Sequence, residues 1–532
     1  MTDYDFDACV IGAGFAGMYM LKRLRDAGFT THVFETADDV GGTWYWNRYP
    51  GARCDVESLY YCYSFDEELQ QEWEWSERYP AQQEILRYCQ HVADRYDLRA
   101  DISFSTTVES AIYSDDTRLW TLRTTTGREV TARYLISAVG CLSAARVPDF
   151  PGLDAFRGET YHTGQWPHEG VDFSGKRVAV VGTGSSGIQA IPAIARYAED
   201  VTVFQRTPNY SVPARNRPLD PAEQAKVKAD YPRLRAEARM TPAGTLAEPT
   251  GKSVFEVPED ERRAELDRRW ENGGAAFLAA FADTMLNVEA NEFSADYVRG
   301  KIREIVRDPD TAEKLTPRDY PLGAKRICVD TDYYATYNRP NVHLVDLRAN
   351  PIETITPTGI RAGGTDHEFD AIVFATGYDA MTGPLNRIDI RGTNGQRLRD
   401  KWSAGPRTYL GVATAGFPNL FIITGPGSPS VLSNMIVSIE QHVEWVADYL
   451  EYLRDKGFTR VEAALDAEDQ WVDHVNEVAS ATLYPKAASW YLGANVPGKP
   501  RVFMPYLGGV DVYRGICDDV AGSDYKGFLL QD

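Results

Sequence analysis

The sequence lacks a CxxC pair, because its seven cysteines stand singly between Cys9 and Cys517. This spacing argues against a dithiol relay and a zinc site, and an odd, scattered set of thiols is typical of a reducing compartment. No apolar run approaches the length that spans a bilayer, and the N-terminus lacks the basic and apolar pattern of a signal peptide. We therefore expect a cytoplasmic protein that neither enters a membrane nor binds a metal.

Basic residues are also scarce: 56 Lys and Arg stand against 77 Asp and Glu, for a formal net charge of −21. Such a surface disfavours nucleic acid and anionic membranes, so any basic residue that binds phosphate must act locally. With 532 residues, of which 43% are hydrophobic, the chain can form two or three ordinary globular domains. We expect a monomer without a nucleic-acid partner.

Two copies of one glycine pattern dominate what the sequence does contain. Each follows a short apolar run, Ala8–Ile11 or Arg177–Val181, and fits a strand, a tight turn and a helix start. The glycines let the backbone approach a pyrophosphate, and the helix N-terminus attracts its charge. The first copy supplies Gly12, Gly14, Phe15 and Gly17, and the second supplies Gly182, Thr183, Gly184, Ser185, Ser186 and Gly187.

The strands that follow the two copies end in opposite charges. Eighteen residues after Gly17 a strand ends in Glu35, and nineteen residues after Gly187 another ends in Gln205-Arg206. An acid at this place accepts hydrogen bonds from ribose hydroxyls, whereas an arginine suits a 2′-phosphate. The sequence therefore predicts two different dinucleotides, NADP(H) at the second copy and, most economically, FAD at the first.

These two units predict an α/β fold with two Rossmann-like dinucleotide-binding domains. We expect the first part of an FAD-binding domain in residues 1–141, an NADP-binding domain in 142–377, and the second part of the FAD-binding domain in 378–532. The chain should return to the FAD domain at Phe374–Asp379, where small residues would let the backbone approach a flavin.

The stretch from about residue 219 to 315 differs in amino-acid composition from the sequence on either side of it. It is rich in charged residues and alanine, shows a period near 3.6 in Ala275–Phe281, and begins with a capping signal at Asp220-Pro221. We expect a helical insertion in the NADP domain.

Two further segments combine glycines with aromatic residues. Val40–Asp55 fits a loop that lies against a flat cofactor, although Asp55 alone fits a helix cap or a surface acid equally well. Residues 148–170 form the expected linker. Within it, the apolar residues of Phe156–Pro167 follow neither the 3.6-residue period of a buried helix nor the two-residue period of a strand. His162 and Trp166 of this segment are expected to couple the domains rather than to transfer protons.

Both segments resemble the signatures of the type I Baeyer–Villiger monooxygenases. The matching strings are Gly41-Gly42-x-Trp44-xxxx-Tyr49-Pro50-Gly51-xxx-Asp55 and Phe156-x-Gly158-xxx-His162-xxx-Trp166-Pro167. The similarity continues through Tyr320–Arg326 and Ala488–Pro500 and covers nearly the whole chain. The resemblance implies an NADPH-dependent flavoenzyme that converts aryl-alkyl or cyclic ketones to esters or lactones with O₂ through a C4a-peroxyflavin.

The resemblance also assigns roles to residues. Arg326 matches the catalytic arginine beside the flavin, and Asp55 matches the acid that positions it. Lys325 and Arg206 match the groups that hold the 2′-phosphate, and Trp490 lies on a mobile loop, about 485–503, that closes over NADP. Other matches at the cofactors are Gly42, Thr43, Trp44, Tyr61, Val108, Gln189, Thr207 and Met435. Without the resemblance, Lys325-Arg326 reads as a solvated basic pair.

An arginine suits this chemistry because its charge does not titrate. Arg326 can therefore keep a peroxy anion unprotonated and stabilise the oxyanion that forms at a ketone. The substrate pocket is expected from Val56, Cys141, Leu142, Ser430, Val431, Leu432 and Met435. Cys141, Val56 and Val431 stand where the resemblance leads us to expect glutamine, isoleucine and alanine, which leaves the substrate range open.

Three other functions fit parts of the pattern. A flavin monooxygenase that oxygenates nitrogen or sulfur shares the two glycine turns, but Trp166-Pro167 favours the ketone-oxidising branch. An NADPH:acceptor reductase of the disulfide type is disfavoured by the missing CxxC pair. A nucleotide-sensing redox regulator would bind both cofactors without substrate-stimulated turnover.

Overall fold

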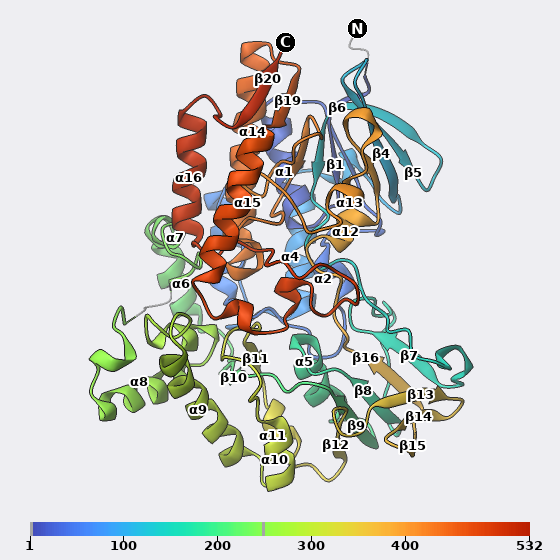
Figure 1. Cartoon of the computed structure of the whole chain (residues 1–532), viewed down its shortest axis with the longest axis vertical. Helices are drawn as coiled ribbons and strands as arrows, with labels where there is room; N and C mark the ends of the chain where they lie inside the picture. The colour runs from blue at the N-terminus through green and yellow to red at the C-terminus, as the bar shows by residue number, and fades with distance from the viewer. Residues whose placement is uncertain (1–3, 247–249) are drawn as a thin grey trace.

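The computed structural model of the chain describes residues 4–246 and 250–532. Its elements gather around two separate sheets, one in the upper and one in the lower half of Figure 1. Both described ends of the chain lie in the upper half, so the chain passes down into the lower half and returns.

An eight-stranded sheet, counted over the described ranges, forms the upper core. Its order is β17-β4-β5-β6-β1-β2-β3, with β18 also paired to β6. Strands β1, β2, β6 and β18 run parallel, and the carboxyl-terminal residues of β1, β6 and β18 are buried. The bounds are β1 Phe6–Ile11, β2 Thr31–Phe34, β3 Ile102–Ser103, β4 Val108–Ser114, β5 Leu119–Thr124, β6 Glu129–Ser137, β17 Asp389–Arg391 and β18 Leu420–Ile422.

A five-stranded parallel sheet, again among the described residues, forms the lower core, in the order β12-β9-β8-β16-β7. Its strands are β7 Glu159–His162, β8 Arg177–Val181, β9 Asp200–Gln205, β12 Val342–Asp346 and β16 Ala371–Phe374. The predicted class, with two Rossmann-like units, is therefore confirmed, whereas the exact domain boundaries stay a prediction. Part of the expected linker is β7, an edge strand.

After Phe374–Asp379 the chain returns to the upper sheet, where β17 pairs with β4. The approach of this segment to a flavin stays a prediction. Strand β16 lies between β7 and β8, and the carbonyl of Ala375 lies against the second glycine turn. The corresponding place at the first turn is taken by Ala138, directly after β6.

The predicted helical insertion is present. Its helices are α6 Pro221–Ala229, α7 Tyr231–Arg239, α8 Glu259–Asn272, α9 Val288–Ile305 and α10 Pro309–Leu315. The Asp220 carboxylate caps α6 by accepting hydrogen bonds from the backbone of Ala222 and Glu223 at 2.8 and 3.1 Å. Ala275–Ala280 forms a 3₁₀ helix rather than the α-helix suggested by its period, and Gly273 and Gly274 before it have positive φ values of 72° and 84°.

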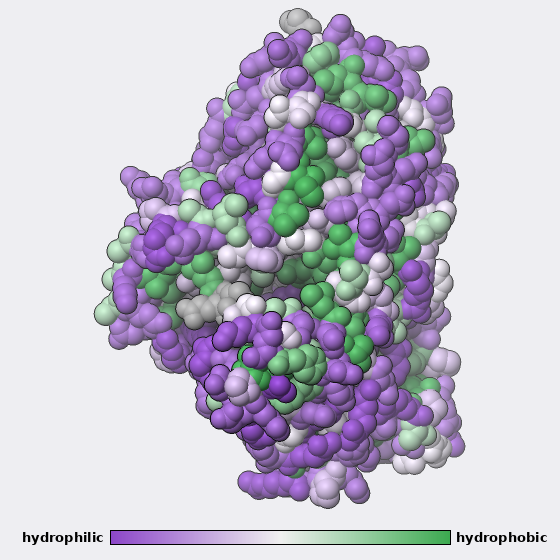
Figure 2. Space-filling model, turned by 60° about the vertical axis from the view of Figure 1, so that its left-hand side comes forward, coloured by the Kyte–Doolittle hydropathy of each residue, from purple (hydrophilic) through white to green (hydrophobic). Residues whose placement is uncertain are grey.

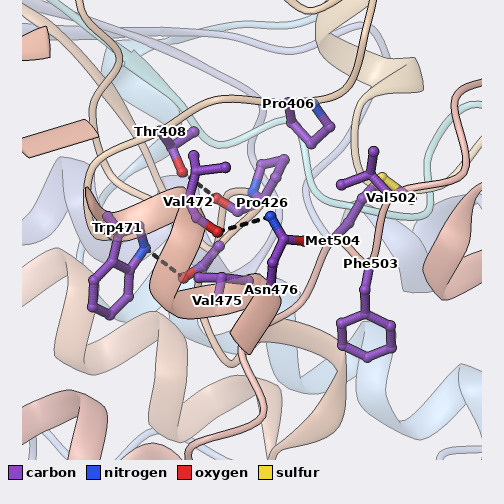
Figure 3. Close-up of a pocket in the computed structure, with 11 residues that line it drawn as sticks. Pro406, Thr408, Pro426, Trp471, Val472, Val475, Asn476, Val502, Phe503 and Met504 are labelled. Carbon is purple, nitrogen blue, oxygen red and sulfur yellow. Dashed lines mark hydrogen bonds between the residues drawn. The ribbon is translucent and has the colours of Figure 1, made fainter. Parts of the chain in front are cut away.

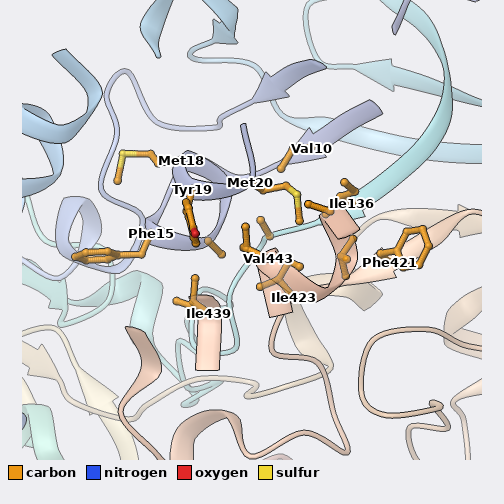
Figure 4. Packing of buried hydrophobic residues seen from close by; sticks show 14 of the residues in the cluster. Val10, Phe15, Met18, Tyr19, Met20, Ile136, Phe421, Ile423, Ile439 and Val443 are labelled. Atoms are coloured by element: carbon orange, nitrogen blue, oxygen red, sulfur yellow. The ribbon is translucent and has the colours of Figure 1, made fainter. Parts of the chain in front are cut away.

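Helices α1 Phe15–Asp26 and α14 Met435–Lys456 pack together beneath the upper sheet. Figure 4 shows Met20 of α1 and Val443 of α14 meeting Val10 and Ile136 of the strands, and all four are fully buried. Burial of each such side chain contributes about 1.5–3 kcal/mol. This packing joins the N-terminal turn to a helix more than 400 residues away in sequence.

Further helices and strands complete the fold. They are α2 Thr43–Trp46, α3 Glu67–Glu72, α4 Gln82–Arg95, α5 Ser185–Ile194, α11 Tyr333–Thr336, α12 Gly383–Asn386, α13 Leu398–Lys401, α15 Leu465–Ser480 and α16 Val510–Gly522, with strands β10 Ser211–Pro213, β11 Cys328–Asp330, β13 Ile352–Thr356, β14 Gly359–Ala362, β15 Thr365–Glu368, β19 Arg460–Ala463 and β20 Phe528–Gln531. The face shown in Figure 2 is mostly hydrophilic, with apolar patches that run from its upper end to its middle. Among the described residues, no helix has both the length and the apolar character to cross a membrane.

Candidate functional site

The first glycine turn joins β1 to α1 as predicted. A Cβ on Gly12 would lie 2.6 Å from the carbonyl oxygen of Ala138, and one on Gly17 would lie 1.8 Å from the oxygen of Gly12. Both positions therefore require glycine. The turn exposes the start of a twelve-residue helix, whose partial positive charge favours a phosphate. This cradle fits the pyrophosphate of a dinucleotide.

Glu35 ends β2 beside this turn. Its carboxylate accepts hydrogen bonds from the backbone of Ala13 at 2.6 Å and of Ala37 at 2.8 Å. Burial raises the pKa of Glu35 above its ordinary value, although these bonds oppose the shift. A carboxylate has further lone pairs that can accept from ribose hydroxyls. Val108 is buried at the start of β4. Two residues before it, the backbone of Thr106 donates a hydrogen bond to the carbonyl of Glu35.

The loop after β2 lies against the first turn. Gly42 has φ 52°, and a Cβ on it would lie 2.9 Å from the Cα of Gly14, so the two loops meet at their glycines. Thr43 is exposed at the start of α2. Trp44 donates from Nε1 to the hydroxyl of Tyr61 at 3.2 Å, and the Tyr61 ring packs against Phe15. The structure thus brings the expected FAD residues of three segments together.

The second glycine turn repeats the first between β8 and α5. A Cβ on Gly182 would lie 2.4 Å from the oxygen of Ala375, and one on Gly187 would lie 2.3 Å from the oxygen of Gly182. The hydroxyl of Thr183 donates to the carbonyl of Thr207 at 3.2 Å, which fixes the turn to the segment after β9. Gly184 and Ser185 stand at the start of α5. This cradle also fits a dinucleotide.

Two basic residues approach each other near the second turn. Arg206 is exposed directly after β9. Lys325 is half-buried, with its Nζ 4.7 Å from the centre of the Tyr320 ring. Burial and the nearby charge of Arg206 lower the pKa of Lys325 to about 8. Two cations whose charges act on each other suit an anionic ligand group such as the 2′-phosphate of NADP.

The centre of the site is an ion pair between Arg326 and Asp55. The guanidinium donates from Nε and Nη2 to the two carboxylate oxygens, each at 2.8 Å, and from Nη1 to the carbonyl of Val431 at 2.7 Å. The structure therefore contradicts the alternatives of a solvated arginine and an unattached surface acid. The two side chains are 32% and 22% exposed, so the pair faces an opening and is not sealed in the core.

Each partner of this pair fixes the charge of the other. The Asp55 carboxylate holds the pKa of Arg326 well above its ordinary value. Burial alone would raise the pKa of Asp55, but the charge of Arg326 and its hydrogen bonds outweigh burial and leave the pKa below its ordinary value. Three N–H groups of the guanidinium are occupied by Asp55 and Val431, and the Tyr491 hydroxyl lies against the guanidinium as well.

Five of the seven residues predicted for the substrate pocket belong to one apolar cluster. Cys141 and Val431 are buried in it, and Leu142, Leu432 and Met435 pack against it together with Trp490. Val56 instead packs against the core beneath the first sheet. Ser430 is fully buried beside the cluster, and its φ of 41° lies in the left-handed region that residues other than glycine rarely adopt.

Residues Trp471 and Val475 of α15 lie beside Pro426, which precedes Ser430 and Val431 in the chain (Figure 3). Trp471 donates from Nε1 to the carbonyl of Gly427 at 3.1 Å, and the hydroxyl of Thr408 donates to Pro426 at 2.6 Å. The small cavity between them has a volume of about 20 Å³. This cavity could hold a single water molecule but not a ketone, so it is not the substrate pocket.

The expected linker and loop residues connect distant segments. His162 is buried; its Nδ1 accepts from the backbone of Gly164 at 3.0 Å, and its Nε2 lies 3.3 Å from the Thr376 hydroxyl. The backbone of Trp166 donates to Trp46 at 3.4 Å. Trp490 begins a short 3₁₀ helix and packs on Tyr491, whose buried hydroxyl lies against Arg326. Asn495 of the same loop donates to the carbonyl of Tyr378 at 2.7 Å.

Sequence reasoning missed the contacts between the two signature segments and α5. Gln189 was expected at the nucleotide, yet its amide bonds to Tyr49 and to the backbone of Arg53. A Cβ on Gly51 would lie 2.5 Å from the Gln189 carbonyl, so the loop sits tightly on the helix. The run Tyr49-Pro50-Gly51 signalled a tight turn, but no local pattern shows which helix it contacts.

Comparisons with known proteins agree with this geometry. A family model described as flavin-binding monooxygenase-like matches residues 7–216. A Baeyer–Villiger monooxygenase of Pseudooceanicola batsensis is 44% identical over 99% of this chain and 96% of its own length. A phenazine N-monooxygenase of Lysobacter antibioticus is 44% identical over 100% of this chain and 98% of its own. A solved steroid monooxygenase bound to NADP is 53% identical, covers 99% of both chains and superposes with a TM-score of 0.95.

Proposed function

Because this chain belongs to the type I Baeyer–Villiger monooxygenase family, we propose that it converts ketones to esters or lactones with NADPH and O₂. The observation that carries the proposal is the arginine that Asp55 and the Val431 carbonyl hold beside an apolar cluster. FAD and NADP are the cofactors: the first glycine turn would hold FAD with Glu35, and the second would hold NADP with Arg206 and Lys325.

When bound, FAD supplies the redox chemistry, because it accepts the hydride of NADPH and activates O₂. Arg326 then stabilises negative charge, first near the activated oxygen and then on the oxygen of the ketone, where a fixed donor acts as a preorganised electrostatic group. Asp55 positions Arg326 and does not act as a base, since its pKa is held low by the arginine. Trp490 and its loop exclude water from the site.

The apolar cluster around Cys141 and Val431 favours large apolar ketones. Its residues are apolar or aromatic apart from the buried thiol of Cys141, so the ketone oxygen finds its polar partner in Arg326. Aryl-alkyl and cyclic ketones meet these conditions. We also propose that the enzyme acts as a cytoplasmic monomer.

Product analysis tests this function. The FAD-loaded enzyme is incubated with NADPH, ¹⁸O₂ and phenylacetone, cyclohexanone or a steroid ketone, and mass spectrometry measures the products. We expect an ester or lactone that carries one ¹⁸O atom for each NADPH consumed. NADPH consumption that no ketone stimulates, with hydrogen peroxide as the product, would contradict the proposal.

Oxygenation of nitrogen is the second candidate, because a phenazine N-monooxygenase matches this chain along its full length as well as a Baeyer–Villiger enzyme does. The same assay with phenazine in place of a ketone separates the two functions. An N-oxide from phenazine without ester from any ketone would establish the alternative.

A further inference from the structure

Helix α5 contacts both chain segments that carry the central ion pair. The Ser185 hydroxyl lies 3.6 Å from the Sγ of Cys328, two residues after Arg326. Gln189 bonds to Arg53, two residues before Asp55. Ser185 and Gln189 are four residues apart and therefore lie on one face of the helix. That face touches the segments on both sides of the pair.

The contact with Arg53 works in both directions. The Gln189 side chain accepts from the backbone N–H of Arg53 at 3.3 Å and donates from Nε2 to its carbonyl at 3.0 Å, while the Tyr49 hydroxyl donates to Oε1 at 2.8 Å. Both acceptor sites and one of the two N–H groups of the amide are thus occupied. Gly51, with φ 83° and no room for a Cβ against the helix, holds the loop in the same register.

We propose that Gln189, with Ser185, is a positioning residue that sets the geometry of the Asp55–Arg326 pair from helix α5. A nucleotide pyrophosphate binds at the N-terminus of this helix, and a displacement of the helix moves the Arg53 backbone through hydrogen bonds that act as one connected network. Nucleotide binding and the orientation of the catalytic arginine are therefore coupled. The proposal rests on the proposed function for what the pair does, but the coupling itself requires no ketone chemistry.

The test compares Gln189→Leu with the matched control Gln224→Leu. Gln224 of α6 clamps the backbone of Trp75 in the same two-way manner, at 3.0 and 2.8 Å, outside the segments next to the ion pair. Both variants lose one glutamine clamp. Hydrogen exchange of the peptide that spans residues 51–56 is measured in the FAD-loaded enzyme with and without NADP⁺, and NADP⁺ affinity is measured by titration.

We expect NADP⁺ to slow exchange in this peptide about tenfold in the wild type and in Gln224→Leu, a typical size for coupling between sites. In Gln189→Leu the slowing should fall below about twofold, while NADP⁺ affinity stays within about threefold of the wild type. At turnover, the same variant should release more hydrogen peroxide per NADPH.

Two outcomes would overturn the proposal. If Gln189→Leu binds NADP⁺ more than about tenfold more weakly but keeps full slowing at saturation, Gln189 is a direct nucleotide contact. If NADP⁺ also fails to slow exchange of the 51–56 peptide in Gln224→Leu, loss of either glutamine destabilises the protein in general. If the leucine variant does not fold, Gln189→Glu takes its place. The glutamate keeps the two accepted hydrogen bonds and loses the donated one. We expect NADP⁺ to slow exchange in this variant at most half as much as in the wild type. A wild type without ketone oxidation would refute the proposed function and leave the exchange result standing.

Discussion

Replacement of Asp55 by asparagine keeps the shape of the side chain and removes its charge. The carboxylate accepts two hydrogen bonds of 2.8 Å from Arg326, each charge-assisted and contributing about 1.5–3 kcal/mol. Asparagine offers one acceptor oxygen and places an NH₂ donor against the second guanidinium N–H. One bond is lost and the other weakens. With a discount for the partial exposure of the pair, we expect a loss of about 2–3 kcal/mol, which is roughly 30- to 160-fold in rate.

The assay separates this effect from flavin reduction. Stopped-flow absorbance measures reduction by NADPH without oxygen, which should change less than about threefold because Asp55 touches neither glycine turn. Ester formation at saturating ketone should fall by the full factor, with hydrogen peroxide in its place. Glu57→Gln is the matched control. Glu57 lies two residues after Asp55 in the chain, and the substitution weakens its ion pair with Arg78. Equal loss in both variants, or an unchanged ester rate in Asp55→Asn, would refute the role given to the pair.

Three further predictions concern charge. Arg206→Ala should raise KM for NADPH far more than KM for NADH, and equal effects would count against its phosphate role. Because the pKa of Lys325 is lowered to about 8, KM for NADPH, but not for NADH, should rise as the pH passes from about 7 to about 9; parallel profiles would contradict this. Burial raises the pKa of Asp330 to about 6, so the folded state holds its proton longer than the unfolded state. Stability from this group is full below about pH 4 and is lost by up to about 3 kcal/mol as the pH rises past 6. Asp330→Asn should therefore raise the unfolding temperature more at about pH 8 than at about pH 5, and an equal shift at both pH values would disprove it.

The two nucleotide units could be predicted from sequence because their signals are local. A glycine such as Gly17 is required by the carbonyl of Gly12 only five residues earlier, and the strand and helix on either side follow at once. The charge at the strand end, Glu35 or Arg206, is equally close to its turn. The cap of α6 at Asp220 was predictable for the same reason.

Long-range pairing was not predictable from local patterns. Asp55 and Arg326 are 271 residues apart in sequence, and only the resemblance to a family joined them. The same limit hid the hydrogen bonds between the Gln189 amide and the loop at Arg53. Strand β7 escaped notice because an edge strand pairs on one side only and has no two-sided apolar run.

The central claim is that the fixed charge of Arg326 turns activated oxygen toward the ketone. The most direct test gives Arg326→Ala and the wild type NADPH, ¹⁸O₂ and phenylacetone, and counts labelled ester against hydrogen peroxide. Removal of one such donor costs about 3–4 kcal/mol in related electrostatic sites. We therefore predict that the variant is still reduced by NADPH but yields hydrogen peroxide and almost no labelled ester. Labelled ester from Arg326→Ala at the wild-type yield would contradict the account.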